Sequence, residues 1–153
     1  MIIDSQTLFS SAQAIFASSA DVVSTNILDL APHLAANAAW VADEGPGEDA
    51  TIQALITTAV TGGTSIQPVL QTDTNTNFAT ALVEFPMCAP VLVASATAGK
   101  VLCNFRIPAT GLKRYLRIAW RNVGANAAGA GSAFIVKDVQ NSPIQTAGGF
   151  TVS

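Results

Sequence analysis

Apolar and polar residues alternate with a period of two along much of this chain. The clearest example is residues 51–60, TIQALITTAV, in which Ile52, Ile56 and Val60 fall on one face. Such alternation, in a run rich in β-branched residues, is typical of a strand with one buried face. Shorter runs of the same kind predict further strands at residues 14–16, 24–30, 66–71, 81–85, 91–95, 101–107, 115–122 and 133–139.

Turn-forming segments separate these runs. They read GPGEDA, TGGT, TDTNTN, FPMCAP, ATAG, PATG and GANAAGAGS. Many short strands with this punctuation are typical of antiparallel sandwiches, jelly rolls and barrels. We therefore predict an all-β fold, an antiparallel jelly roll or β-sandwich of about eight to nine short strands. Residues 1–20 are expected to form an N-terminal arm or the first strand, and residues 31–50 one long loop.

The length and hydropathy of the chain predict one domain without a membrane span. The chain has 153 residues, of which half are hydrophobic and 11% are charged. A chain of this length can bury a sufficient core, so residues 1–153 are expected to form a single domain. The N-terminus does not resemble a secretory signal. The most apolar region, residues 90–103, is interrupted by Ser, Thr and Lys before it reaches the roughly 18 residues of a membrane span.

Charge is distributed unevenly along the chain. Residues 1–99 contain nine acids and no Lys or Arg, whereas residues 100–153 contain all seven bases and one acid. In one compact domain part of this asymmetry cancels locally, and what stays exposed favours a complementary surface. Self-association, as a dimer or a trimer, is the simplest case. The other interpretation is that the asymmetry arose by chance, because the chain has so few charged residues.

Residues 111–124, GLKRYLRIAWRNVG, hold four of the seven bases within nine positions. As a helix, the run would carry basic residues at every fourth position, opposite apolar ones. As a strand, it would point Leu116, Ile118 and Trp120 inward and Arg117 and Arg121 outward. The run lies between two glycines, its neighbours are predicted strands, and it lacks a helix N-cap. We therefore predict a strand.

A basic strand beside Tyr115 and Trp120 also suggests binding of single-stranded nucleic acid, through phosphate contacts and base stacking. Three observations oppose this hypothesis. Trp120 falls on the inward face of the predicted strand, the net charge is −3, and no nucleic-acid-binding motif is present. We therefore do not expect a nucleic-acid partner.

Catalytic and metal-binding patterns are nearly absent from the sequence. His33 is the only histidine, and it lies in an alanine-rich segment rather than in a recognisable catalytic motif. Together with Cys88 and Cys103 it does not provide the three or four ligands of a zinc site. Both cysteines are interpreted as small thiols, and whether they pair stays open. We expect no enzymatic activity, metal or cofactor.

One segment partly matches a calcium-binding loop. Asp73, Asn75, Asn77 and Glu84 fit positions 1, 3, 5 and 12 of that motif, but Phe78 occupies the position of its turn glycine. No flanking helices are predicted. A hairpin loop rich in Thr and Asn is therefore the preferred interpretation.

Three sequence blocks, residues 2–30, 111–120 and 130–140, carry a resemblance to a known family. In the first block the matching residues are Asp4, Phe9, Ser10, Gln13, Ala14, Ser24, Thr25, Asn26, Asp29 and Leu30. The second block matches G-[LY]-K-R-[YF]-[LI]-R, and the third matches D-V-Q at residues 138–140. In these blocks the chain resembles the Bordetella-phage-type family of capsid cement proteins of tailed bacteriophages. Residues 31–44 depart most from the family pattern.

The resemblance implies a viral structural protein, made in the host cytoplasm and bound to the outer surface of an icosahedral capsid. Its partners would be the major capsid protein, whose neighbouring copies it bridges and stabilises, and further copies of itself. The residues we expect at an interface are Lys113, Arg114, Arg117, Arg121, Asp4, Phe9 and Asp29. Reversing Arg117 and Arg121 to Glu should then weaken assembly and leave the monomer folded. The other interpretation of the basic residues is a solvated strand face.

A carbohydrate-binding jelly roll from a phage tail or baseplate is the main alternative function. Sugar sites use exposed aromatic residues with acids and amides nearby. Only Trp40, close to Asp43 and Glu44, suggests such a site, and Trp40 is equally interpretable as a residue that anchors the long loop.

Overall fold

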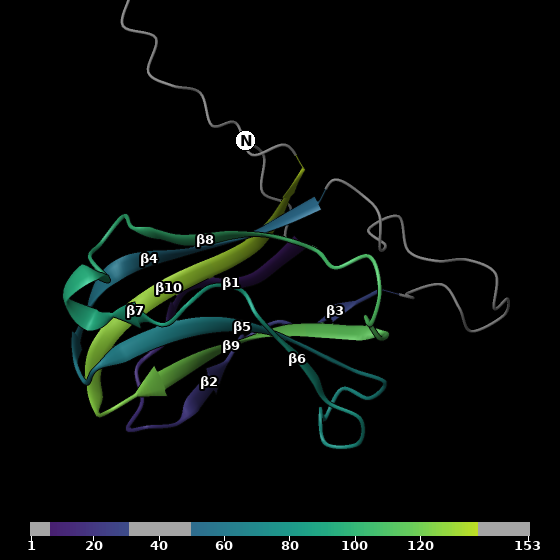
Figure 1. The fold of residues 1–153 in the computed structure, drawn as a ribbon, viewed down its shortest axis with the longest axis horizontal. Helices are drawn as coiled ribbons and strands as arrows, with labels where there is room; N and C mark the ends of the chain where they lie inside the picture. The colour runs from purple at the N-terminus through teal and green to yellow at the C-terminus, as the bar shows by residue number, and fades with distance from the viewer. Residues whose placement is uncertain (1–6, 31–49, 138–153) are drawn as a thin grey trace, which may run out of the picture.

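The computed structural model describes residues 7–30 and 50–137, which form two antiparallel β-sheets packed face to face (Figure 1). The first sheet has the order β1 (Leu8–Ala14), β10 (Asn126–Lys137), β4 (Ala50–Gly62) and β8 (Val101–Arg106). The second has the order β2 (Asp21–Val23), β9 (Tyr115–Val123), β5 (Ser65–Asp73) and β6 (Val83–Pro86). Two short strands extend this second sheet, β3 (Leu28–Asp29) beside β9 and β7 (Val91–Leu92) beside β5.

The strand order is that of a jelly roll. Without the two-residue strands β3 and β7, eight strands remain, and the first pairs with the last, the second with the next to last, and so on inward. Successive pairs lie in alternate sheets. This nested pairing of an eight-stranded chain is the arrangement of jelly rolls. The prediction of an all-β, antiparallel jelly roll or β-sandwich is therefore confirmed.

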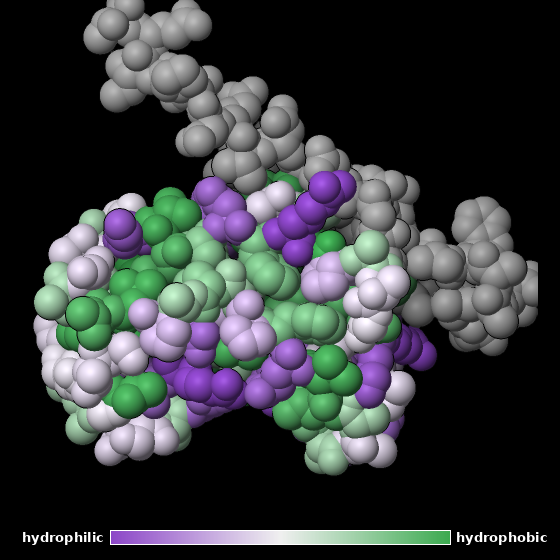
Figure 2. Space-filling view, in the orientation of Figure 1, coloured by the Kyte–Doolittle hydropathy of each residue, from purple (hydrophilic) through white to green (hydrophobic). Residues whose placement is uncertain are grey.

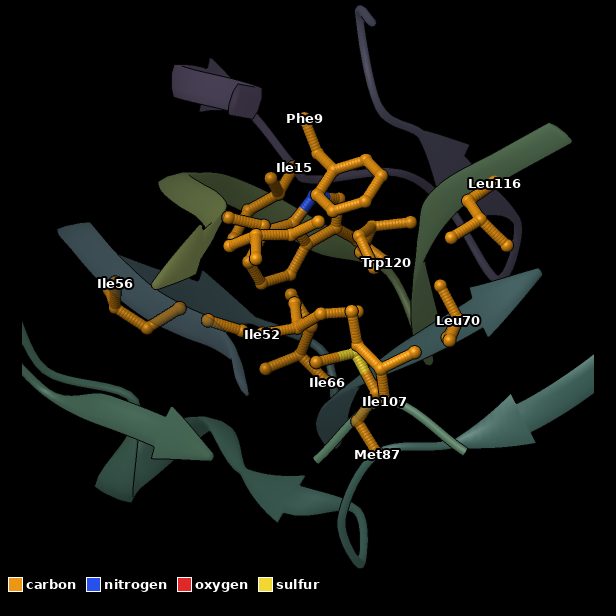
Figure 3. Packing of buried hydrophobic residues seen from close by; sticks show 14 of the residues in the cluster. Phe9, Ile15, Ile52, Ile56, Ile66, Leu70, Met87, Ile107, Leu116 and Trp120 are labelled. Atoms are coloured by element: carbon orange, nitrogen blue, oxygen red, sulfur yellow. The ribbon is translucent and has the colours of Figure 1, made fainter. Parts of the chain in front are cut away.

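The core lies between the sheets and follows the predicted alternation (Figure 3). From β4, Ile52 and Ile56 point inward and are fully buried. From β9, Leu116, Ile118 and Trp120 are likewise fully buried, so the strand predicted for residues 115–122 is confirmed. Apolar burial of this kind provides the main stabilisation of a sandwich.

The segment GANAAGAGS, predicted as turn material, is mostly strand, because β10 begins at Asn126. Its small residues serve close packing. A Cβ atom at Gly131 would lie 2.9 Å from Cη2 of Trp120, so only glycine leaves room for the indole ring. Gly129 adopts φ 147° against Val60, close to register shifts between β10 and β4. The bulge needs that backbone freedom.

Several predicted strand boundaries are wrong. The first strand is β1 rather than residues 14–16, and residues 24–30 do not form one strand but contribute only β3. There the Ser24 hydroxyl accepts the N–H of Ile118 at 3.1 Å and donates to the carbonyl of Asn26 at 2.8 Å, which replaces a regular ladder. Residues 91–95 form β7 followed by the short 3-10 helix η2 (Val93–Ser95). Ala50 belongs to β4 rather than to the long loop.

The Thr- and Asn-rich segment after β5 is a hairpin loop, as preferred from the sequence, since β5 and β6 pair antiparallel. The carboxylate of buried Asp73 accepts the N–H groups of Asn75 at 3.2 Å and Ala81 at 3.1 Å. Burial alone would raise the pKa of Asp73, but these backbone hydrogen bonds lower it overall. The Asp73 carboxylate thus stabilises the loop through its backbone hydrogen bonds.

Some sequence predictions concern residues outside the described ranges. These are residues 1–6 of the predicted N-terminal arm, most of the long loop, Asp4, His33 and Trp40. Among the residues the structure does describe, no group of three or more His, Cys, Asp or Glu side chains could hold a metal ion. In the same ranges no helix has the length and apolarity needed to cross a membrane.

Candidate functional site

The basic residues of β9 lie on the outer face of the second sheet, which we call the charged face. On β9 they alternate with the buried residues, and the register places Gln67 opposite Arg121 and Gln71 opposite Arg117. One strand further, Glu84 of β6 lies opposite Gln71. The predicted inward and outward directions of β9 are therefore correct.

Arg121 is held between two acids from other strands. Its Nη2 lies 3.1 Å from Oδ2 of Asp21 on β2 and 2.9 Å from Oε1 of Glu84 on β6. Hydrogen bonds to Asp21 and Glu84 raise the pKa of Arg121. The pKa of Glu84 is lowered by its hydrogen bond from Gln71 and by Arg121. The arginine thus ties the two sides of the sheet together.

Arg117 continues this network. Its Nε donates to Oε1 of Gln71 at 2.7 Å, and Gln71 in turn donates to Oε1 of Glu84 at 2.7 Å. The Arg117 guanidinium also lies 4.1 Å from the ring centroid of Phe78, a cation–π contact that covers it. Burial lowers the pKa of Arg117. The network therefore runs across β2, β9, β5 and β6.

The other two bases of the stretch are also engaged within the chain. Arg114 donates from Nε and Nη2 to the two carboxylate oxygens of Asp29, both at 2.9 Å, which raises the pKa of Arg114. This bidentate geometry is the strong form of the pair. Lys113 donates from its backbone N–H to Oγ1 of Thr72 at 2.8 Å and from Nζ to the carbonyl of Ala81.

The charge asymmetry of the sequence thus cancels where bases of β9 and its preceding turn meet acids of the first half of the chain. The face is a network of paired charges instead of an open positive surface. Trp120 is fully buried, and Arg114 lies 4.9 Å from the ring centroid of Tyr115. This stretch therefore does not present the stacking platform that the nucleic-acid hypothesis required.

Two further predicted interface residues are accounted for by the fold. Phe9 has 1% of its surface exposed and belongs to the core, so its side chain cannot meet a partner and that assignment is corrected. Asp29 forms the ion pair with Arg114. Phe9 was assigned to an interface because its segment matched a family pattern. Such a pattern does not distinguish a residue that packs in the core from one that contacts a partner.

A hydrogen-bonded clasp between β1 and residues 23–26 was not predicted from the sequence. The Gln13 side chain donates to the carbonyl of Val23 at 2.6 Å and accepts the N–H of Thr25 at 3.0 Å. Asn26 donates from its backbone and side chain to the carbonyls of residues 9 and 8, at 3.0 and 2.9 Å. Because β1 and β2 are edge strands of different sheets, the clasp closes one side of the sandwich. In the sequence, only the match of Gln13 and Asn26 to the family pattern indicated that these two residues have a structural role.

An open pocket of about 400 Å³ lies beside the clasp, lined by residues 7–9 and 25–28. Both polar and apolar groups line it. Ile27, one of its lining residues, is 41% exposed.

Exposed apolar side chains flank the charged network. On the charged face, Val123 and Leu92 are register partners of the same residue, Ser65, and are 49% and 60% exposed. Val23 on β2 is 40% exposed. From the side of β6 and β8, hydrophilic and hydrophobic areas lie next to each other on the surface (Figure 2). The charged face thus combines fixed charges with exposed apolar side chains.

A protein-family model described as Bbp16 matches residues 9–135. The chain belongs to the Bbp16 family. This is a Bordetella phage protein family, which agrees with the phage relationship inferred from the sequence. No curated protein matches the chain.

The Bbp16 match covers almost all of the clasp and all of the charged face. The charged face and the clasp, apart from Leu8, lie inside residues 9–135, whereas Asp4 and residues 138–140 lie outside them. Most of the residues that carried the resemblance are therefore positioned within the matched region of this Bbp16 protein, in hydrogen bonds, ion pairs or the core.

Proposed function

We propose that this Bbp16 protein is a capsid cement protein, which binds the outside of an icosahedral phage capsid and stabilises neighbouring major capsid proteins. The observation that carries the proposal is the Bbp16 family match, which spans a jelly-roll domain. The resemblance of the same residues to phage cement proteins gives the specific role.

A rigid monomer suits this task. The sheets enclose one core cluster, and the clasp joins β1 to the β2 side. A shell offers many identical sites, so single contacts can be weak when several are engaged together, because linkage raises the effective concentration. A preorganised surface also lowers the entropic cost of each contact.

The contact surface in this proposal is the charged face with its apolar flank. Exposed Val123 and Leu92 would supply apolar area that is buried on docking. Arg117 and Arg121 would set the register, since their positions are fixed by Gln71, Asp21 and Glu84. The same surface could join copies of this chain.

A binding experiment tests the proposal. Capsid shells that lack this protein are mixed with the purified chain, and the bound fraction is measured by sedimentation. Saturable binding is expected for the wild-type chain, and Val123→Asp should weaken it at least about tenfold because a buried charge lacks a partner. The matched control is Val101→Asp, which changes a valine of similar exposure on β8 of the other sheet.

Two results would contradict the proposal. Absence of wild-type binding to shells would refute the cement role itself. Equal loss of binding in the Val123 and Val101 variants, both folded, would refute the assignment of the charged face and leave the cement role standing.

A further inference from the structure

Cys88 and Cys103 lie on the side of the sandwich opposite the clasp. Cys103 is on β8, the edge strand of the first sheet, and Cys88 follows β6, the edge strand of the second. The clasp joins the edges at β1 and β2, whereas β8 and β6 are the opposite edges of the two sheets and lie on the same side of the sandwich (Figure 1).

Register and packing direct Cys103 inward. It pairs with Ala54, which is fully buried on the inner face of β4, so the Cys103 side chain points toward the other sheet. It also packs against the core cluster. Its backbone is fixed by the ladder between β4 and β8.

Cys88 is held in place from the other side. The preceding residue, Met87, is buried in the core and donates its N–H to the carbonyl of Pro68 at 3.1 Å. The Cys88 carbonyl accepts Nε2 of Gln67 at 2.6 Å. In the close view Met87 lies in the same part of the core as Ile107, which follows β8 (Figure 3). The two edges therefore converge at this point.

The two thiols are free. Cys103 lowers the pKa of Cys88, whereas Cys88 and burial raise the pKa of Cys103. Cys88 is therefore the thiol expected to attack first. Both thiols are partly exposed, so a small reagent can reach them.

We infer that Cys88 and Cys103 are an oxidation site, at which a low-molecular-weight disulfide such as oxidised glutathione converts the two thiols into one cross-link between the sheets. The Cys88 thiolate attacks one sulfur of the reagent and expels a glutathione thiolate. Cys103, after losing its proton to solvent, then attacks the Cys88 sulfur of the mixed disulfide and expels the second glutathione. The chain loses two electrons and two protons, and the reagent is reduced to two molecules of glutathione.

The inference does not depend on the proposed function. If the chain is part of a virion, the site has a use: the protein folds in a reducing cytoplasm with free thiols and meets oxidising surroundings after lysis. The cross-link would then close the second side of the sandwich in the released particle.

Intact-mass spectrometry of the full chain, incubated with oxidised glutathione under native conditions, tests the inference. We expect a mass lower by two hydrogen atoms, loss of both titratable thiols after denaturation, and a linked Cys88–Cys103 peptide in a non-reducing digest. The cross-link closes a short loop, so the midpoint of thermal unfolding should rise by about 6–12 °C and return on reduction.

Variants separate the site from general thiol chemistry. Cys103→Ala should stop at the mixed disulfide and gain the mass of one glutathione, and Cys88→Ser should react far more slowly. Since a core variant can fail to fold, the wild-type peptide map decides. Two bound glutathiones, a disulfide-linked dimer, or two unreacted thiols in the wild-type chain would each overturn the inference.

Discussion

Charge reversal at Arg121 is the sharpest test of the charged face. From the sequence, reversing Arg117 and Arg121 was expected to leave the monomer folded. The structure changes that expectation, because Arg121→Glu would place a third carboxylate between Asp21 and Glu84. The variant should therefore be less stable before any partner is involved.

The magnitude follows from the exposure of the pairs. The side chains of Arg121, Asp21 and Glu84 are 35%, 32% and 33% exposed, so each ion pair contributes about 0.2–1 kcal/mol. Arg121→Gln, which removes both, should cost about 0.5–2 kcal/mol. Repulsion between like charges about 4 Å apart near a surface adds roughly 1–4 kcal/mol, with solvent favouring the lower end. We therefore expect Arg121→Glu to lower the free energy of unfolding by about 2–4 kcal/mol.

Urea unfolding, followed by intrinsic fluorescence, measures this loss. The deficit of Arg121→Glu should shrink in 1 M NaCl, where the screening length is only about 3 Å. Adding Glu84→Arg should recover part of it, because that pair is then restored with inverted signs. Lys100→Glu, a reversal at an exposed turn, should change stability by less than about 0.5 kcal/mol. A stability of Arg121→Glu equal to that of Arg121→Gln at low salt would refute the reasoning.

Three further outcomes are expected. Gly131→Ala should destabilise the fold by about 1–3 kcal/mol in urea, because its Cβ would meet the ring of Trp120 at 2.9 Å, whereas exposed Ala127→Ser on the same strand should cost little. Asp73 has a lowered pKa in the folded state, so its contribution to stability is present above its unfolded value near 3.8 and is lost as the pH falls through the lower folded value. The thermal midpoint of Asp73→Asn should consequently depend less on pH in that acidic window, and curves parallel to wild type would contradict the assignment. Gln13→Ala should cost about 1–2 kcal/mol and raise amide exchange in residues 23–26 more than elsewhere, and uniform exchange would argue against a local clasp.

The sequence predicted the fold class because alternation with a period of two is a local signal. Residues 51–60 and 115–122 carry that signal clearly and form β4 and β9. The start of β10 could not be predicted in the same way. Gly131 must be glycine because Trp120 packs against it, and that requirement exists only once the sheets are stacked.

The candidate site was predictable only in part for a related reason. The cluster of bases is visible in residues 113–121, but the partners of Arg121 lie 100 and 37 residues away in the chain. Pairing across strands of one sheet brings them together, and no local pattern records it. Phe9 shows a second limit of sequence-based prediction. It matches the family pattern, but its side chain is buried in the core instead of lying at an interface.

The copy number of this chain relative to the major capsid protein in purified virions tests the cement role most directly. Quantitative mass spectrometry of particles washed in high salt would measure it. A stoichiometry comparable with that of the major capsid protein is the predicted result, because a cement protein occupies equivalent positions over the whole shell. A handful of copies per particle, as expected for a tail component, or absence from the virion would contradict the account.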